Sequence, residues 1–534
     1  MGKHAVRRAC VVFVLLLFVL SPAATQSESG LPSYLYHESA PQAASGAVTV
    51  ERVTAALPQL EALAEQILES TGTPGFAIAV VFDDEVVYLN GFGVRRVGET
   101  QTVDPDTVFQ IASMSKPMAS TVVAGLVGDG VVSWDDRIVQ HDPGFEMPDP
   151  WVTHAVTLRD MFAHRSGLPG HGGDLLEDMG YGRDEVLYRL RFGKPGGEFR
   201  ADYAYTNFGL TEAAVAAAKA AGKTWEDICE ERLYQPLGMS STSSRFADYE
   251  AAANRAWTHA RVGDRWVARY VRQPNAQSPA GGVSSTVRDL AQWMRLQLGN
   301  GTIDGKEVIS AKALGETHAP QIVSHMPVDP STERAGFYGL GWNISYDALG
   351  RVRLSHSGAF AYGASTAVYL LPAEKLGITV ISNGSPIGVP EGLCLSFLDL
   401  ATYGEIQRDY VTLLGSMLAE SLKPAYDTDY STPPAQPSAA LPLETYAGTY
   451  YNDYFGDIDI AIDGGGLVIR EEPDLVAFPM EHWDRDVFYY QPTGENAGGL
   501  SGVTFTIGAD RRATLVTVEN LDIHGNGMFA RVSK

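Results

Sequence analysis

The stretch "FQIASMSKPMAS", Phe109–Ser120, places a serine and a lysine three residues apart, with a proline directly after the lysine. Residues at this spacing lie on the same face of a helix, so Ser113 and Lys116 can meet if the segment is helical. A proline fits a helix only in the first turn, where the backbone N–H groups have no intrahelical acceptor. Pro117 therefore predicts that a helix begins close to Ser113.

A serine at a helix N-terminus beside a lysine has the chemistry of an activated nucleophile. The helix dipole stabilises negative charge on the serine oxygen, and a poorly hydrated lysine loses its proton more readily and acts as a base. A serine and a lysine also meet at this spacing by chance, but Lys116 is the only lysine in the chain with a serine three residues before it. Ser115 points about 200° away around the helix. Ser113 and Lys116 are therefore the candidate nucleophile and base.

Two further motifs follow in the chain. "ADYAYTNFGLTEAAV" contains Tyr205 and Asn207 two residues apart, and "RVRLSHSGAF" contains His356-Ser357-Gly358 on a predicted strand. A phenol acts as a base near neutral pH only where a nearby cation lowers its pKa, so we expect Tyr205 to work with Lys116. Each motif alone is weak, but their order along the chain is specific.

The ordered motifs resemble the serine β-lactamase and penicillin-binding-protein superfamily, in its class C-like branch. Three more stretches resemble segments of this branch, so the resemblance spans roughly residues 51 to 400; they are "VTLRDMFAHRSGLPGH", "YQPLGMSST" and "SPAGGVSSTVRDLAQWM". The sequence has no G-x-S-x-G nucleophile elbow, which argues against an α/β-hydrolase.

The resemblance implies a role for each motif residue. Ser113 would be the acylated nucleophile, and Lys116 and Tyr205 the pair that moves its proton. Asn207 would hold the substrate and Lys116. The backbone N–H groups of Ser113 and Ala359 would form the oxyanion hole.

The third motif departs from the pattern of many β-lactamases, because His356 stands where they carry a lysine. Histidine holds less positive charge at neutral pH, so we expect His356, with Gly358 beside it, to grip a substrate carboxylate less firmly. Histidine here is similar to what some DD-peptidases, D-aminopeptidases and esterases of the superfamily show. The alternative is a histidine that is merely packed on a strand.

The pattern of the whole chain predicts an α/β (α+β) fold in two parts. One antiparallel sheet, assembled from strands at both ends of the first domain, is covered by helices and joined by an all-helical subdomain. A small all-β, barrel-like domain follows, because residues after 440 alternate at strand period. We divide the chain into a signal peptide at 1–23, a flexible segment at 24–50, a hydrolase domain at 51–422, a proline-rich linker at 423–440 and the C-terminal domain at 441–534. A single amphipathic helix is expected from about 390 to 422.

The N-terminal sequence and the net charge indicate where the protein is located and which classes of partner it can bind. A basic start, the apolar run Val11–Leu20 and small residues at 21–24 predict a secretory signal and a secreted or periplasmic protein. The formal net charge is −24 and the pI about 4.9, which argues against nucleic acid and anionic membrane surfaces as partners. We expect a small-molecule or peptide substrate, no cofactor, and no membrane contact after signal cleavage, and leave the oligomeric state open.

Several other groups carry weaker predictions. A loop with His164, His171 and Asp174 could be drawn as a metal site, but its glycines and proline favour an ordinary loop. The spacing of aspartates 457, 459 and 463 favours the solvent-exposed face of a strand over a calcium site. Trp342 and Tyr362 would line the pocket or pack in the core. The two cysteines of the mature chain, 229 and 394, either pair or remain buried thiols.

These observations favour an exported serine hydrolase that works through a Ser113 acyl-enzyme. A peptidase or amidase of the DD-peptidase or D-aminopeptidase type leads, followed by a carboxylesterase and then a β-lactamase. A protein of another class, which binds penicillins or peptides without turnover, is the remaining alternative. The presence of all four polar motif residues weakens it; they are Ser113, Lys116, Tyr205 and Asn207.

Overall fold

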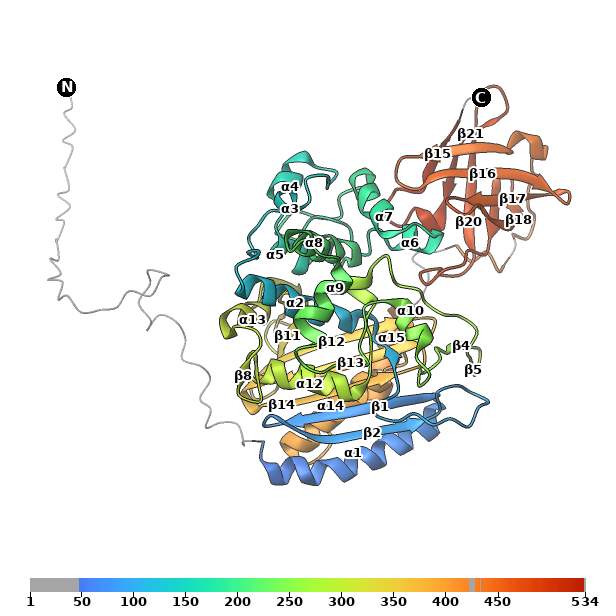
Figure 1. The fold of residues 1–534 in the computed structure, drawn as a ribbon. Helices are drawn as coiled ribbons and strands as arrows, with labels where there is room; N and C mark the ends of the chain where they lie inside the picture. The colour runs from blue at the N-terminus through green and yellow to red at the C-terminus, as the bar shows by residue number, and fades with distance from the viewer. Residues whose placement is uncertain (1–47, 422–427, 433, 533–534) are drawn as a thin grey trace, which may run out of the picture. The chain divides into compact units, whose positions relative to one another are not determined.

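A computed structural model describes residues 48–421, 428–432 and 434–532. The predicted signal peptide, nearly all of the segment 24–50 and part of the predicted linker lie outside these residues. The described chain forms a sheet domain with its helices, followed by a barrel (Figure 1).

The central sheet is antiparallel and has eight strands (Figure 1). Its edge-to-edge order is β2 (Glu85–Gly93), β1 (Gly75–Phe82), β14 (Leu376–Ser382), β13 (Ala364–Leu371), β12 (Val352–Phe360), β11 (Asn343–Tyr346), β10 (Gly336–Tyr338) and β9 (Ile322–His325). The hairpin β1–β2 therefore pairs with β14, nearly 300 residues later, in the register Phe76↔Ser382. This confirms a sheet assembled from both ends of the domain.

Strand β1 is buried on both faces, which explains its nearly continuous apolar sequence "GFAIAVVF". Successive side chains of a strand point to opposite faces. Phe76, Ile78 and Val80 pack in one cluster with helices α1 (Val50–Thr71) and α14 (Val389–Tyr403). The alternate residues of β1, all alanine or valine, belong to the core on the other face. The sheet is thus a middle layer between two helical layers.

The second helical layer positions the motifs. Helix α2 (Ser115–Gly128) carries Lys116 and lies with α12 (Val287–Leu298) on the face opposite α1, and α8 (Asn207–Ala220) begins at Asn207. The remaining helices of this part are α3 (Ile138–His141), α4 (Pro150–Ala155), α5 (Leu158–Phe162), α6 (Asp174–Met179), α7 (Arg183–Arg189), α9 (Trp225–Cys229), α10 (Phe246–Ala251), α11 (Ser278–Gly281) and α13 (Ala311–Thr317). Short strand pairs link them: β3 (Phe109–Gln110) with β6 (Ser284–Ser285), β4 (Ala260–Val262) with β5 (Arg265–Val267), and β7 (Thr302–Ile303) with β8 (Lys306–Glu307).

The expectation of one helix from about 390 to 422 is wrong. The chain forms α14, which ends at a Gly404 C-cap with φ 83°, and a separate helix α15 (Tyr410–Ser421). The left-handed conformation of Gly404 is open to glycine at little cost, and it stops the helix there. Helix α15 packs back onto α14.

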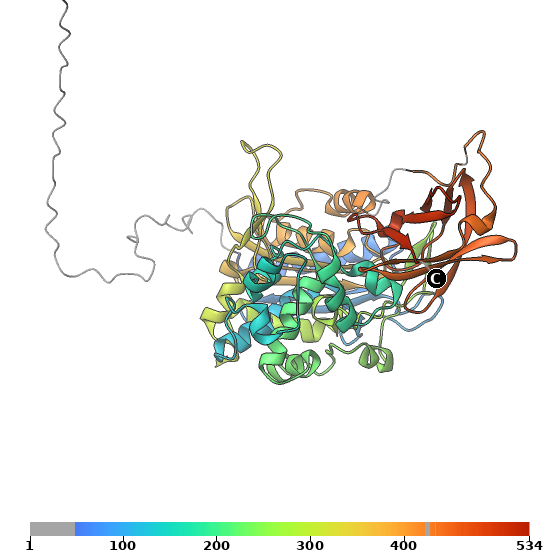
Figure 2. The same ribbon diagram turned by 90° about the horizontal axis from the view of Figure 1, so that it is seen from above.

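The C-terminal domain is a closed eight-stranded antiparallel barrel, orange to red in Figures 1 and 2, as the alternating pattern predicted. Its strands are β15 (Gly448–Asn452), β16 (Gly456–Asp463), β17 (Gly466–Glu471), β18 (Val476–Asp484), β19 (Val487–Tyr490), β20 (Ser501–Ile507), β21 (Ala513–Val518) and β22 (Met528–Arg531). The barrel closes where β15 pairs with β22. Alternation along β16 buries Ile458 and Ile460 inside and leaves their neighbours at the surface.

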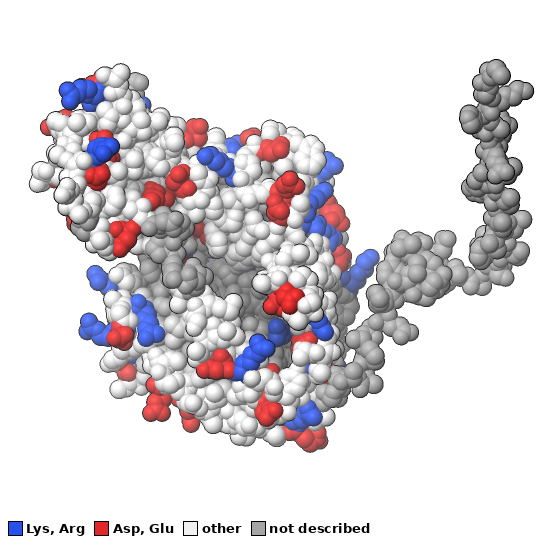
Figure 3. Space-filling view, turned by 180° about the vertical axis from the view of Figure 1, so that it is seen from behind, with Lys and Arg blue, Asp and Glu red and all other residues white. Residues whose placement is uncertain are grey.

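Two properties of the surface bear on the expected partners. Figure 3 shows acidic and basic side chains interspersed over one face, with no large basic patch on that face. Among the described residues, no helix combines the length and apolar character required to span a bilayer.

Candidate active site

Ser113 lies in a tight turn immediately before helix α2. The turn is the 3₁₀ helix η3 (Ala112–Met114), and α2 begins at Ser115, so the helix starts where Pro117 predicted. Ala112 adopts φ 47°, which is uncommon for a residue with a side chain. Ser113 is only half-buried and remains accessible at the end of the helix.

Ser115, the neighbouring serine, has a different role. Its side chain is fully buried. The hydroxyl donates to the Ala112 carbonyl at 2.7 Å and accepts from the Val283 N–H at 3.0 Å. Ser115 therefore braces the strained turn and is unavailable as a nucleophile.

Lys116 is fully buried and faces three oxygen atoms. Its Nζ lies 3.1 Å from Ser113 Oγ, 2.6 Å from Asn207 Oδ1 and 3.0 Å from the Ala280 carbonyl oxygen. Burial lowers the pKa of Lys116 to about 7, although the charge of Asp174 acts in the opposite direction. Near neutral pH, the neutral amine is therefore well populated.

The two other oxygens determine how that neutral amine is oriented. A neutral amine has two N–H bonds and one lone pair. The Asn207 side-chain oxygen and the Ala280 carbonyl can only accept hydrogen bonds, so they take the two N–H bonds. The lone pair is left facing the third neighbour, Ser113 Oγ. The geometry suits Lys116 to act as a base toward Ser113.

A buried carboxylate orients the amide of Asn207. Its Nδ2 donates to Asp174 Oδ2 at 2.8 Å, which leaves Oδ1 for Lys116. His171 Nδ1 also bonds this oxygen of Asp174 at 2.9 Å, and this bond is the main reason that the pKa of His171 is raised. Asp174 thus supports the lysine through Asn207 without touching Lys116 by a hydrogen bond.

Tyr205 lies next to the pair, but its pKa moves in the direction opposite to our expectation. The Lys116 Nζ is 4.5 Å from the centre of its ring. Burial raises the pKa of Tyr205 far above its ordinary value, and a hydrogen bond with Ser113 only partly opposes this. The phenol is therefore protonated at neutral pH and suits a proton donor or relay, whereas Lys116 has the lower pKa and the contact with Ser113 that suit a base.

His356 is neutral, so it does not serve as a cation for a substrate carboxylate. It is 3% exposed, its Nδ1 bonds the Ser357 carbonyl at 2.7 Å, and its Nε2 bonds the Tyr338 hydroxyl at 3.0 Å. Burial, with the charge of Lys116, lowers the pKa of His356 to about 3. A backbone carbonyl can only accept, so the ring proton is on Nδ1. The arrangement supports the packing alternative: His356 lies behind Tyr338 and Tyr205.

Gly358 lets strand β12 approach the nucleophile. A Cβ at this position would lie 2.3 Å from the Ile111 carbonyl oxygen and 2.9 Å from the Ser113 nitrogen. Any side chain would push the strand away. The next residue, Ala359, is exposed and pairs with Ser365 of β13. The structure therefore brings the third motif against the turn that carries Ser113.

The family model described as "Beta-lactamase" matches residues 60–397. The chain belongs to the beta-lactamase family. A second model, described as a domain of unknown function (DUF3471), matches residues 432–529, the region of the barrel. The membership confirms the resemblance drawn from the three motifs, and it makes the protein a serine hydrolase of this superfamily with an additional C-terminal domain.

The chain is similar to three curated proteins over most of its length. Penicillin-binding protein 4 of Amycolatopsis lactamdurans is 27% identical over 71% of this chain and 93% of its own length. "Unguisins hydrolase ungD" of Aspergillus violaceofuscus is 26% identical over 73% of this chain and 74% of its own. The D-alanyl-D-alanine-carboxypeptidase/endopeptidase AmpH of Escherichia coli K12 is 24% identical over 64% and 87%.

A solved structure shares the fold. The octameric penicillin-binding protein homologue from Pyrococcus abyssi has a TM-score of 0.55 and 20% identity, and the match covers 87% of this chain and 98% of that one. This likeness confirms the antiparallel sheet covered by helices.

Within this beta-lactamase-family site, sequence reasoning missed a layer of aromatic residues. The ring of His164 lies 4.5 Å from that of Tyr205 and 4.8 Å from that of Tyr338, measured between centroids. His164 Nδ1 accepts from the Thr206 N–H at 3.2 Å. Burial lowers the pKa of His164 well below its ordinary value, so the ring is neutral. In the sequence, His164 is visible only as the first residue of "HRSGLPGH", whose glycines and proline predict an ordinary loop.

The other candidates have structural roles. His164, His171 and Asp174 support Tyr205 and Asn207, and the described residues contain no cluster suited to a metal. Trp342 is fully buried and stacks on Trp293 at 5.5 Å, so it belongs to the core. Both cysteines, 229 and 394, are free and buried, which supports the thiol alternative.

Proposed function

We propose that the protein is an exported serine hydrolase that cleaves amide or peptide bonds through a Ser113 acyl-enzyme, in the manner of DD-peptidases or D-aminopeptidases. One observation carries the proposal: the lone pair of a lysine with a pKa of about 7 is directed at Ser113 Oγ by two acceptor-only neighbours. Such an arrangement produces a serine nucleophile at neutral pH. A protein that only binds ligand has no need of it.

The proposed reaction uses residues already in contact. Ser113 Oγ bonds to the substrate carbonyl carbon while its proton passes to Lys116 Nζ. The N–H groups of Ser113 and Ala359 stabilise the charge on the carbonyl oxygen. The C–N bond breaks as the leaving amine takes a proton from the Tyr205 phenol, which recovers one from Lys116. Water then cleaves the ester in the same sequence of proton transfers.

Two features narrow the substrate. His356 is neutral, so it supplies no cation for a carboxylate near the scissile bond. Within the proposed class, this favours D-aminopeptidase-like amides and internal peptide bonds over a C-terminal residue whose carboxylate lies beside the bond cleaved. The Escherichia coli relative is named as a D-alanyl-D-alanine carboxypeptidase and endopeptidase, and the Aspergillus violaceofuscus relative is named as a hydrolase. The name of the Escherichia coli relative supports a peptide substrate.

The test of the mechanism is active-site labelling. A fluorophosphonate probe should label the protein once, on Ser113, and Ser113→Ala should abolish labelling. The matched control is Ser120→Ala, a buried serine of the same helix that bonds only to Pro117. Labelling that survives in Ser113→Ala would reject the nucleophile.

The test of the substrate is a panel of chromogenic compounds. We expect turnover of D-aminoacyl p-nitroanilides to exceed that of p-nitrophenyl esters and of nitrocefin, relative to each compound's rate in buffer. Faster relative turnover of esters or nitrocefin would reassign the enzyme to those classes. Labelling of Ser113 without turnover of any compound would favour a binding protein.

Export is proposed from the first 23 residues alone, on their basic, apolar and small-residue order. Expression of the full chain should yield a secreted protein whose N-terminus, read by peptide sequencing, lies near residue 24. Retention of residues 1–23 would overturn this part of the proposal.

A further inference from the structure

The loop between β19 and β20 is one of several barrel segments that contact the catalytic domain. Glu495 in this loop accepts hydrogen bonds from the backbone N–H groups of Ala361 and Tyr362, the latter at 3.3 Å. The N–H of Gly494, next to it, donates to the Tyr362 hydroxyl at 3.1 Å. A carboxylate from the second domain thus caps the turn between β12 and β13.

The turn in question follows directly from the third motif. Strand β12 ends at Phe360, and Ala359, whose N–H we assign to the oxyanion hole, is two residues before Ala361. Strand β11 pairs with β12 only up to Ser355, so the last residues of β12 extend past the end of that partner. Among the described residues, the end of β12 has no strand partner on this side, while β13 pairs with it on the other side as far as Phe360. Glu495 adds two hydrogen bonds to the turn that follows.

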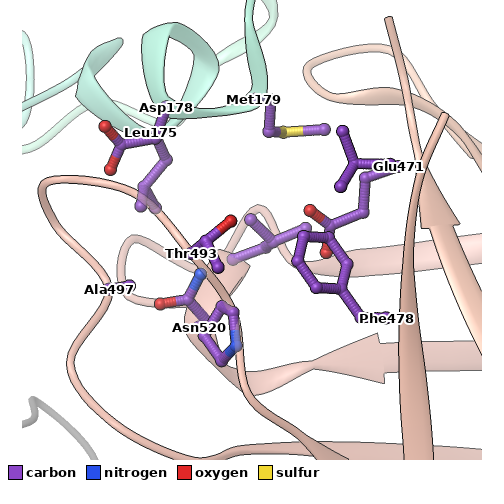
Figure 4. Close-up of a pocket in the computed structure, with 11 residues that line it drawn as sticks. Leu175, Asp178, Met179, Glu471, Phe478, Thr493, Ala497 and Asn520 are labelled. Atoms are coloured by element: carbon purple, nitrogen blue, oxygen red, sulfur yellow. The ribbon is translucent and has the colours of Figure 1, made fainter. Parts of the chain in front are cut away.

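The same loop is tied to the other side of the site. The N–H groups of Glu495 and Asn496 donate to the Asp178 carboxylate at 3.1 and 2.8 Å. Asp178 is on α6, one turn after Asp174, which orients Asn207. In Figure 4, Leu175 and Asp178 of α6 lie beside Thr493 and Ala497 of the loop, around a cavity of only about 40 Å³. The loop therefore contacts both α6, which carries the residue that orients Asn207, and the turn that follows Ala359.

We propose that Glu495 is a positioning residue, by which the barrel holds the end of β12 and, through it, the Ala359 N–H in the geometry of the oxyanion hole. The proposal rests on the proposed acyl-enzyme function. An oxyanion-hole donor acts only when it lies at hydrogen-bond distance from the developing charge, and loss of one donor costs about 10²–10³-fold in rate. Partial displacement of the donor should cost less, on the order of ten- to a hundred-fold.

The charged neighbours of Glu495 fit this role. Burial raises the pKa of Glu495 to about 7, while Arg272 and the two N–H groups of the turn favour the carboxylate. Asp178 acts against it, and Tyr362 is the other titratable group nearby. The ionised form accepts both N–H groups. The capped turn is therefore best held above neutral pH.

The test compares Glu495→Ala with Glu495→Gln. On the best substrate of the panel, Glu495→Ala should lower kcat by about ten- to a hundred-fold with little change in KM, because the oxyanion hole acts in the transition state. Glu495→Gln keeps one acceptor oxygen without the charge, so it should recover part of the loss. An unchanged kcat in Glu495→Ala, or a change confined to KM, would overturn the proposal.

A second contact between the domains provides the control. The Tyr181 hydroxyl donates to the carbonyl of Phe455, between β15 and β16 of the barrel, at 2.9 Å, and not to the loop that carries Glu495. Tyr181→Phe should leave kcat within about two-fold of the parent protein. An equal loss in Tyr181→Phe and Glu495→Ala would assign the effect to barrel docking and reject a specific role for Glu495. Fluorophosphonate labelling of the parent protein tests the proposed function separately. If Ser113 is not the nucleophile, the parent protein will not be labelled, whatever the two variants show.

Discussion

Two buried cations, Lys116 and Arg272, lie in the same domain and behave in opposite ways. Lys116 is surrounded by neutral acceptors, and burial lowers its pKa to about 7. Arg272 forms ion pairs with Glu177 and with Asp178, the latter at 2.9 Å. Burial acts against its charge too, but the carboxylates outweigh it and hold the pKa of Arg272 above its ordinary value.

The difference shows that burial alone does not decide the state of a buried cation. An isolated charge transferred to a poorly hydrated site is costly, so the group tends to lose it. Opposite charges in contact reverse the outcome and convert the cation into a fixed structural element. Around Lys116, the carboxylate of Asp174 is hydrogen-bonded to Asn207 and not to the lysine, so its charge raises the pKa of Lys116 without forming an ion pair with it. This spacing keeps the lysine titratable.

The largest effect should follow from removal of the titratable cation. Lys116→Ala should slow acylation by about 10²–10⁴-fold, because proton transfer in the attack is lost. Single-turnover labelling with the fluorophosphonate probe measures the acylation step. Lys116→Arg should be no better, since a guanidinium keeps its proton at neutral pH.

Lys219→Ala is the matched control, because Lys219 is a partly exposed lysine paired with Asp142. It should leave labelling unchanged. Tyr205→Phe should also slow acylation by an amide, measured as the single-turnover release of p-nitroaniline, because the leaving amine takes its proton from Tyr205. In the same assay, the double variant with Lys116→Ala should be little worse than either single variant if the two act as one unit. Multiplicative losses would mean that Tyr205 and Lys116 act independently.

The next largest effect concerns the structural cation. Arg272→Met should destabilise the fold by about 3–5 kcal/mol, because it leaves two buried carboxylates without their partner. Denaturant unfolding measures the loss. Arg288→Met removes an exposed ion pair with Asp106 and should cost less than about 1 kcal/mol. Equal effects of the two substitutions would show that the buried cluster contributes no more than a surface pair.

The sequence predicted the part of the site that depends on local spacing. Ser113 and Lys116 share one helix turn, and Pro117 locates its start, so the pair follows from helix geometry alone. Tyr205, Asn207 and Gly358 required the family resemblance, because nothing local links these segments to Ser113.

The other features of the site depend on tertiary contacts, which the spacing of residues in the sequence does not reveal. Asp174 was noticed, but the sequence does not show that its carboxylate meets Asn207. The direction of the Tyr205 pKa depends on burial, which is a property of the folded chain. Glu495 lies in another domain and was not singled out at all. Gly404 separates α14 from α15, but the apolar pattern on both sides of it predicted a single helix.

A smaller effect should appear in the pH dependence of stability. Burial raises the pKa of Glu177 from an ordinary value of 4.5 to about 7. Between these two values the folded protein binds a proton that the unfolded chain has released, so this group's contribution to stability is lost as pH rises from about 4.5 through 7. Glu177→Gln cannot titrate, so its stability relative to that of the parent should rise as pH rises across this range, on top of a constant cost of losing the ion pair with Arg272. Melting temperatures from pH 5 to 8 measure it, with the exposed Glu99→Gln as control; parallel curves for parent and Glu177→Gln would contradict the shift.

The smallest effect tests how the carboxylate of Asp174 acts on Lys116 at a distance. Only the neutral amine accepts the Ser113 proton, so acylation by the parent protein should rise with pH through about 7 and then level off. The charge of Asp174 favours the ammonium form and raises the pKa of Lys116. Asp174→Asn removes this charge and keeps an oxygen that can accept from Asn207, so the rising limb should move to lower pH while the plateau changes little. Asp135→Asn, at an exposed position paired with Arg159, should leave the limb in place. A limb that stays fixed in Asp174→Asn, or moves to higher pH, would mean that Asp174 acts only by orienting Asn207 and that its charge does not reach the lysine.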